Sequence, residues 1–411
     1  MDWMRVVACF MVMVVHSTEP FYLGGPGTQV ASASDALWVT IVDSLVRACV
    51  PLFIIASSYL QFPLHYPAGK FLRRRALRVV VPLLVWSVVY ALIWGEPVQN
   101  FKDLLLNFNY AAGHLWFVYM IVGLYLVMPL LSPWASRVSR RQLRFYLGIW
   151  LFTTTLPFLR IAFGGEPPVI YGPSGIPNPA RYPLWGEASW NANGTFYYLS
   201  GLAGYLLVGL YFRRFAPVWS TRKSVFIGLL LWACGFVISA GGFQYLMHRS
   251  TLGVYPFSGP TGFAAIWETP WLFDSTGVAL MSIGLIILFR LTGASGRTSS
   301  LSPAPSPSAG VSGDFASPAA SISPGVSGDL WRGWFYRRIV LPISGASYGM
   351  YLCHMVFLGS WYSIYSNLLG PLQAVVRTPL VILCTALSTY LTSAALSLLL
   401  SRLPKFGKYL T

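Results

Sequence analysis

Three histidines stand inside apolar stretches of this sequence, and they are the residues best suited to do chemistry. They are His16, His114 and His354. A neutral imidazole can take a proton from an alcohol near pH 7, and an ionisable group inside an apolar segment is costly unless it serves a purpose. A histidine in a helix can also be a hydrogen-bonded packing residue. We therefore treat His16 and His354 as catalytic candidates and His114 as a supporting one.

The first apolar stretch carries Asp2, Arg5, His16 and Glu19. Arg5 and His16 are separated by about three helical turns, so they share one helix face about 16 Å apart along the axis. This spacing predicts Arg5 near one membrane surface and His16 at mid-membrane depth or beyond. Glu19 follows near the far end of the same helix.

Other polar residues recur at helical spacing in later apolar stretches. Asp43 and Arg47 stand at i and i+4, where they can neutralise each other, so this pair has a structural as well as a functional interpretation. Tyr351 and His354 share one face of a further helix. Asp274 is a lone carboxylate in another apolar stretch.

The composition predicts a membrane protein. Of 411 residues, 55% are hydrophobic and only 10% are charged, which is more apolar surface than one soluble core buries. The apolar residues form blocks of about 18 to 24, the length of a membrane-spanning helix, whereas barrel strands are shorter and alternate. We expect an all-α polytopic protein with the lipid bilayer as its partner.

Ten spans are expected. They lie near residues 3–22, 38–61, 76–94, 114–132, 145–163, 195–212, 224–244, 271–290, 341–362 and 378–401. Every second loop is rich in Lys and Arg, and such loops stay in the cytoplasm. This alternation predicts a plasma (inner) membrane protein with both termini cytoplasmic. The cations of these loops also account for the net charge of +16, so this charge does not indicate nucleic-acid binding.

Residues 292–330 form a Ser/Pro/Gly-rich tract that cannot bury a core, so we expect a disordered cytoplasmic linker. It divides one membrane domain into residues 1–291, with eight of the expected spans, and residues 331–411, with the last two. The outer loop near 164–194 is rich in Pro, Gly and aromatic residues, which suits an ordered cap or an interfacial aromatic belt. The five cysteines show no CxxC or metal-type spacing, so we expect neither disulfides nor a metal. Asp2 and Arg5 favour a retained first helix over a cleaved signal peptide.

Several motifs in order along nearly the whole chain resemble the acyltransferase 3 family of membrane acyltransferases. They are Asp2-Trp3-Met4-Arg5 with Val15-His16-Ser17, Val50-Pro51-Leu52-Phe53 with Ser57, Arg75-x-x-Arg78 with Val81-Pro82, His114-Leu115-Trp116-Phe117, and Ser347-Tyr348-Gly349-Met350-Tyr351-Leu352-Cys353-His354. The segment Phe196 to Gly209 is similar to the subgroup that acetylates surface polysaccharides. Ser58 departs from the family pattern, which commonly has Gly there.

The resemblance implies transfer of an acyl group, commonly acetyl from acetyl-CoA, to a hydroxyl of a surface or lipid-linked glycan. It implies His16 as general base and places Arg5 with His16 and His354 among the catalytic residues, where Arg5 contacts the acyl donor or fixes the helix. No permanently bound cofactor is expected. The phosphates of the donor are expected to bind the cations at one cytoplasmic helix end, which are Arg73, Arg74, Arg75 and Arg78. The alternative interpretation is that these arginines only fix the membrane topology. Asp2, Glu19, Asp43, Arg47, His114, Trp116, Tyr351 and Asp274 are expected to support the site or contact the acceptor.

Two other classes of protein remain open at this point. A glycan transporter would also use many helices and intramembrane charges, but the sequence shows no convincing internal repeat. A non-catalytic assembly factor would not need Arg5, His16, Arg75 and Arg78 together. Direct transfer and a two-step route through an acyl-histidine are equally compatible with the sequence.

Overall fold

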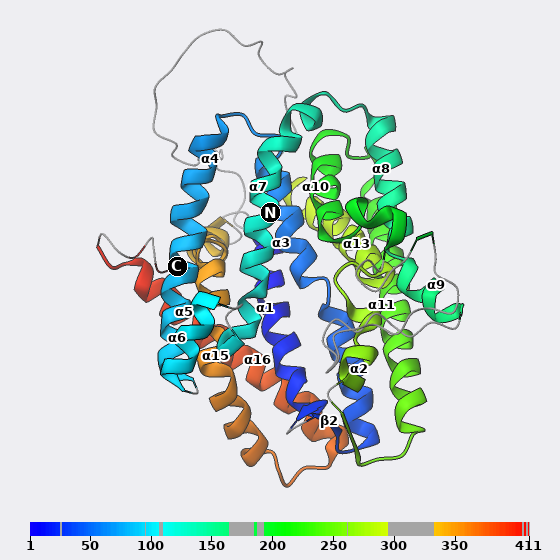
Figure 1. Ribbon diagram of the computed structural model, residues 1–411, viewed down its shortest axis with the longest axis vertical. Coiled ribbons are helices and arrows are strands. Elements are labelled where there is room, and N and C mark those ends of the chain that lie inside the picture. Colours follow the sequence, from blue (N-terminus) through cyan, green and yellow to red (C-terminus); the bar gives the residue numbers. More distant parts are fainter. Residues whose placement is uncertain are drawn as a thin grey trace.

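The computed structural model is a helical bundle elongated along one axis (Figure 1). It describes every residue except 25–26, 95, 107–109, 164–184, 187–192, 261, 295–332, 405–406, 408–409 and 411. Residues 295–330 of the expected linker and most of the expected outer cap at 164–194 therefore lie outside the described residues, whereas residues 292–294 form the end of the helix Thr276–Ala294.

The described α-helices are α1 (Asp2–Thr18), α2 (Ala33–Val46), α3 (Cys49–Gln61), α4 (Ala68–Arg75), α5 (Val81–Ile93), α6 (Pro97–Leu106), α7 (Trp116–Arg137), α8 (Arg140–Thr153), α9 (Leu156–Ala162), α10 (Gly204–Arg214), α11 (Thr221–Thr251), α12 (Gly262–Trp267), α13 (Thr276–Ala294), α15 (Leu341–Leu368) and α16 (Ala374–Ser401). Short 3₁₀ segments are η1 (Glu19–Phe21), η3 (Tyr110–Leu115), η4 (Gly194–Leu199), η5 (Gly201–Ala203) and η6 (Thr269–Trp271), and π-helical turns are η2 (Ala76–Val80) and η7 (Tyr336–Val340).

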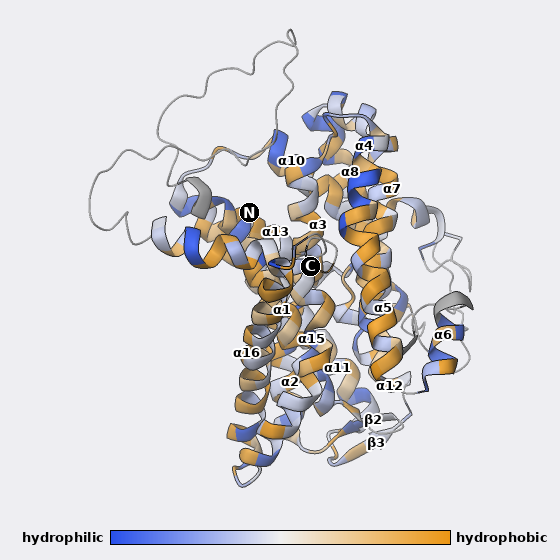
Figure 2. Ribbon diagram, turned by 90° about the vertical axis from the view of Figure 1, so that its left-hand side faces the viewer, coloured by the Kyte–Doolittle hydropathy of each residue, from blue (hydrophilic) through white to orange (hydrophobic). Residues whose placement is uncertain are grey.

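Nine helical runs of the described chain are long and apolar enough to cross a membrane, and they match nine of the ten expected spans. The bundle needs an apolar solvent, because large side chains such as Leu84 (60% exposed) and Leu130 (79% exposed) face outward. Figure 2 shows hydrophobic residues covering α5, α7 and α16 along their length.

The expected span at 195–212 is not one continuous helix. The chain forms η4 and η5 before the 11-residue α10 begins at Gly204. Gly201 has φ +76°, and its carbonyl accepts a 2.8 Å hydrogen bond from Trp150 Nε1. This left-handed turn breaks the helix, and sequence hydropathy does not reveal it.

Glycines allow neighbouring helices to approach closely. A Cβ on Gly235 of α11 would lie 2.3 Å from the carbonyl oxygen of Gly277 on α13. On α10, a Cβ on Gly209 would lie 2.6 Å from Cβ of Ser58 on α3, and Ser58 Oγ donates a 2.6 Å hydrogen bond to Leu206 O. Ser58, the departure from the family pattern, thus ties α3 to α10.

A small antiparallel sheet closes one end of the bundle, where the label β2 stands in Figure 1. Its strands are β1 (Leu23–Gly24), β2 (Gly27–Val30) and β3 (Phe257–Gly259), in the order β1-β2-β3. We call this the sheet end. The opposite end carries α4 with its arginines, and we call it the arginine end. The candidate site lies along the axis between these two ends.

Candidate active site

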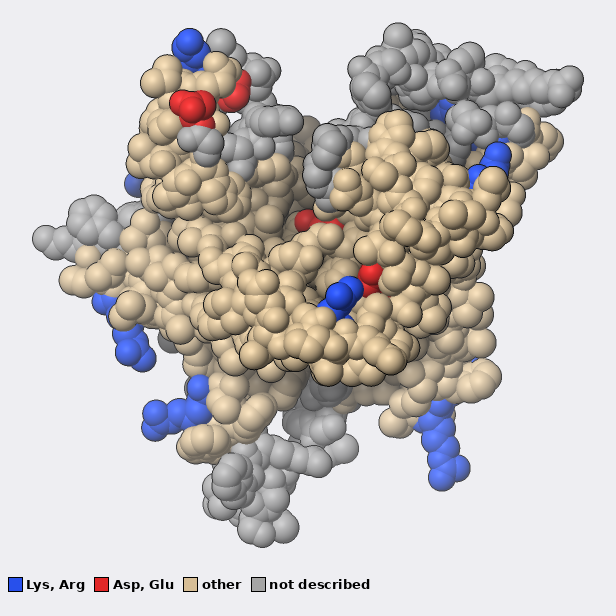
Figure 3. All heavy atoms as spheres, turned by 90° about the horizontal axis from the view of Figure 1, so that it is seen from below, with Lys and Arg blue, Asp and Glu red and all other residues tan. Residues whose placement is uncertain are grey.

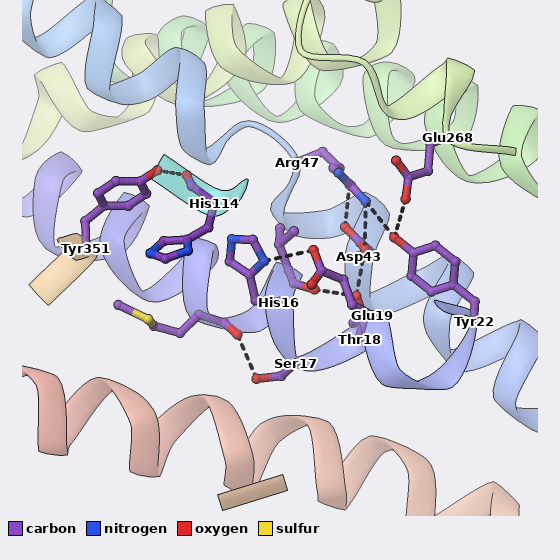
Figure 4. Close-up of polar contacts among 12 residues, drawn as sticks. His16, Ser17, Thr18, Glu19, Tyr22, Asp43, Arg47, His114, Glu268 and Tyr351 are labelled. Carbon is purple, nitrogen blue, oxygen red and sulfur yellow. Dashed lines mark hydrogen bonds and ion pairs between the residues drawn. The ribbon is translucent and has the colours of Figure 1, made fainter. Parts of the chain in front are cut away.

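His16 and Glu19 form a pair where α1 runs into η1. His16 Nδ1 lies 2.8 Å from Glu19 Oε1. A carboxylate can only accept here, so it holds the imidazole with a proton on Nδ1 and leaves Nε2 to act as a base. The sequence predicted His16 as the base and placed Glu19 only near the helix end; the structure makes Glu19 its direct partner (Figure 4).

The three histidines predicted as candidates gather from three separate elements. The His354 ring lies 5.1 Å from that of His16 and 5.1 Å from that of His114. His354 Nδ1 lies 2.6 Å from the backbone oxygen of Tyr351, which can only accept. His354 is fully buried and does not line the cavity beside His16. Its Nε2, like that of His114, has no hydrogen-bond partner within the described chain.

A second polar network braces the far side of the pair, as Figure 4 shows. Arg47 forms a 2.6 Å ion pair with Asp43, which also accepts a 2.7 Å hydrogen bond from Thr18. Tyr22 accepts a bond from Arg47 at 3.3 Å and donates one to Glu268 at 2.6 Å. Asp43 and Arg47 thus form the ion pair that their spacing allows, and the network links α1, α2 and the segment before η6.

Glu268 and Tyr22 are site residues that sequence reasoning missed. Burial raises the pKa of the Glu268 carboxyl, although the nearby Arg47 acts in the opposite direction. Burial also raises the pKa of the Tyr22 hydroxyl. They are 246 positions apart in the chain, so no spacing pattern relates them.

A cavity of about 370 Å³ opens beside the His16–Glu19 pair, and we call it the histidine cavity. Its wall includes His16, Glu19, Arg47, His114, Trp116, Glu268, Asp274 and Tyr351. Trp116 stacks on Phe273 with ring centroids 5.5 Å apart, so it forms a flat apolar part of this wall. Six of the eight predicted support residues therefore line the cavity directly, together with His16; Asp2 and Asp43 do not.

A second cavity of about 410 Å³ lies toward the arginine end, and we call it the arginine cavity. Its wall includes Arg5, Arg75, Arg78, Ser57, Tyr125 and Ser347. Arg75 donates to Gln61, and its guanidinium stands 5.0 Å from the centroid of Tyr125. The cavity therefore concentrates three cations beside hydroxyl groups.

Of the four arginines expected to bind the donor, the structure brings Arg75 and Arg78 to the arginine cavity. Arg73 and Arg74 are exposed and are absent from the wall of the arginine cavity. Arg74 instead lies over the ring of Tyr66 at 5.7 Å. The reason is helical geometry, because residues one or two positions before Arg75 project from other faces of the helix.

Asp2 supports the site from a distance. It accepts hydrogen bonds from Tyr336 (2.6 Å) and Ser344 (2.8 Å), and so ties the start of α1 to η7 and α15. These bonds hold the helix that carries both Arg5 and His16.

The two cavities meet at a thin partition. Phe117 and Tyr351 line both of them, with ring centroids 5.2 Å apart. The Tyr351 hydroxyl donates to the backbone oxygen of His114, which fixes its ring in this position. One α-helix, α1, runs past the partition with Arg5 on one side and His16 on the other.

Comparison with known proteins gives one positive result. No curated protein and no solved structure is similar enough to count as a match. The family model described as an acyltransferase domain matches residues 1–398, which includes every residue of the two cavities. Its activity class, acyl transfer within a membrane, argues against the transporter alternative. The chain therefore belongs to the acyltransferase 3 family of membrane acyltransferases.

Proposed function

We propose that this protein moves an acyl group, most simply acetyl, from acyl-CoA in the arginine cavity to a glycan hydroxyl in the histidine cavity. The observation that carries the proposal is the shared partition. Phe117 and Tyr351 separate a chamber lined by three cations from a chamber that contains a histidine–carboxylate pair. A donor and an acceptor can thus approach each other from opposite sides.

The arginine cavity suits the phosphates of the donor. Guanidinium groups bind phosphate oxygens through paired hydrogen bonds, and they do so best where water is partly excluded. Arg5, Arg75 and Arg78 reach this chamber from α1, α4 and η2. The thioester end of the donor then extends toward Phe117 and Tyr351.

The histidine cavity suits activation of the acceptor. His16 Nε2 removes the proton from the attacking hydroxyl while Glu19 stabilises the imidazolium that forms. The oxygen bonds to the thioester carbon, the carbon–sulfur bond breaks, and the thiolate recovers a proton to leave as the free thiol. In the two-step alternative, His16 itself carries the acyl group before the acceptor arrives.

Charge distribution supports a direction for this transfer. Cation-rich loops remain in the cytoplasm, where acyl-CoA is available. The arginine end then faces the cytoplasm, and the sheet end faces outward, in a plasma membrane. Glycans at the outer surface reach the histidine cavity from that side.

The test uses purified protein in detergent with acetyl-CoA and the cell's own surface glycan, freed of ester groups by mild alkali. We expect thiol release and an acetyl mass gain on the glycan with wild type. His16→Ala should show neither while remaining folded. If wild type consumes no acyl-CoA in detergent, the proposal is wrong and a transporter becomes the better explanation.

A further inference from the structure

A third cavity, of about 480 Å³, lies at the sheet end outside the two cavities of the reaction. Its wall is formed by Pro20, Phe21, Gln29, Asp35, Tyr362 and Arg377, among others. We propose that this sheet-end groove is a second binding site for the acceptor, which holds a neutral, hydroxyl-rich part of the glycan away from the reacting hydroxyl. The inference rests on the proposed function, because it extends the acceptor side of that reaction.

The groove is adjacent to the histidine cavity through a single turn of chain. Glu19 lines the histidine cavity, whereas the next two residues, Pro20 and Phe21, line the groove. All three belong to η1, and three residues of 3₁₀ helix advance only about 6 Å. A polymer with one unit beside His16 can therefore rest a neighbouring unit in the groove.

The charges of the groove favour a neutral ligand. Asp35 is 1% exposed and accepts hydrogen bonds from Ser32 (2.8 Å) and Thr378. Arg377 Nη2 stands 4.0 Å from Asp35 Oδ1, and its side chain is 32% exposed. One carboxylate beside one guanidinium leaves no net charge to select an anion, while the N–H donors of the partly exposed Arg377 guanidinium suit hydroxyl groups.

Aromatic and amide groups complete a surface of the kind that binds sugars. The rings of Phe21 and Tyr362 meet edge to face at 5.8 Å, and Phe257 contributes a third ring. Apolar ring faces pack against the C–H faces of a sugar, and Gln29 and Ser258 add hydrogen-bonding groups. A lipid tail would find charged and amide groups here, which argues against it.

The groove is placed to receive a ligand from outside the bundle. It is bounded by the end of α15, the start of α16, the start of α2 and the strands β2 and β3, all at the sheet end. Figure 3 looks onto this face, which is mostly uncharged and hollowed near its middle, where acidic and basic side chains lie side by side.

The experiment compares Tyr362→Ala and Gln29→Ala with wild type, using the cell's own de-acylated glycan and its single-repeat fragments as acceptors. Tyr365→Ala is the matched control, because Tyr365 lies on the same helix but bonds to Ser388 and does not line the groove. Acetyl-CoA hydrolysis, with water as acceptor, is measured alongside.

We expect Tyr362→Ala and Gln29→Ala to raise KM for the long glycan about ten-fold, the cost of one lost contact of about 1.4 kcal/mol. KM for single repeats, acetyl-CoA hydrolysis and the Tyr365→Ala control should stay near wild type. Unchanged KM for the long glycan in both groove variants would overturn the inference, as would an equal loss with single repeats. Failure of wild type itself to transfer acetyl would instead contradict the proposed function.

Discussion

At the residue scale, the proposed chemistry depends on two groups held three positions apart at the end of α1. His16 is the proposed base, and Glu19 fixes its orientation, because Glu19 Oε1 lies 2.8 Å from His16 Nδ1. The pairing is local, so a sequence alone can place both residues on the same turn of chain. The pairing of His16 with His354 and His114 depends on helices far apart in the sequence, and no spacing rule predicts their 5.1 Å contacts.

Glu19→Gln should lower kcat about 100- to 10,000-fold, because the amide can present its N–H to Nδ1 and so favour the wrong tautomer of His16. KM for acyl-CoA should change little, since Glu19 lines only the acceptor-side cavity. Steady-state assays in detergent measure both constants. Wild-type kcat in this variant would show that the carboxylate has no part in the chemistry.

The arginines offer a matched comparison within one helix. Arg75→Gln should raise KM for acyl-CoA about 10- to 150-fold through loss of one charge-assisted contact of about 1.5 to 3 kcal/mol. Arg73→Gln should leave it unchanged, because Arg73 is exposed outside the arginine cavity. Equal effects of the two substitutions would mean that general positive charge, rather than the cavity, attracts the donor.

At the element scale, hydropathy and loop charge predicted nine of the helices that can cross a membrane. A membrane-spanning helix needs about 20 consecutive apolar residues, and such a run is visible in the local sequence. These helices could therefore be predicted. The break near Gly201 is not, because it depends on a hydrogen bond from Trp150 on another helix.

Close contact between α11 and α13 should be sensitive to a single methyl group. Gly235→Ala places Cβ 2.3 Å from Gly277 O, so the helices must separate, at a cost of about 1 to 3 kcal/mol. Gly241→Ala on the same helix meets nothing within 4 Å and should be neutral or slightly stabilising. Thermal unfolding in detergent compares the two, and equal melting temperatures would refute this packing.

At the scale of the whole molecule, α1 connects the two chambers. It carries Arg5 on the arginine cavity and His16 on the histidine cavity, while Phe117 and Tyr351 form the partition between them. The spacing of Arg5 and His16 was predictable from helix geometry. The chambers were not, since their walls come from helices that only the folded chain brings together.

The most direct measurement of this account is transfer across a sealed membrane. Inside-out vesicles containing the protein are loaded with de-acylated surface glycan, and labelled acetyl-CoA is added only outside, with His16→Ala vesicles as control. We predict that label accumulates as glycan ester inside wild-type vesicles and not in the control. Ester formation only when donor and acceptor share one side of the membrane would contradict transfer between the two chambers.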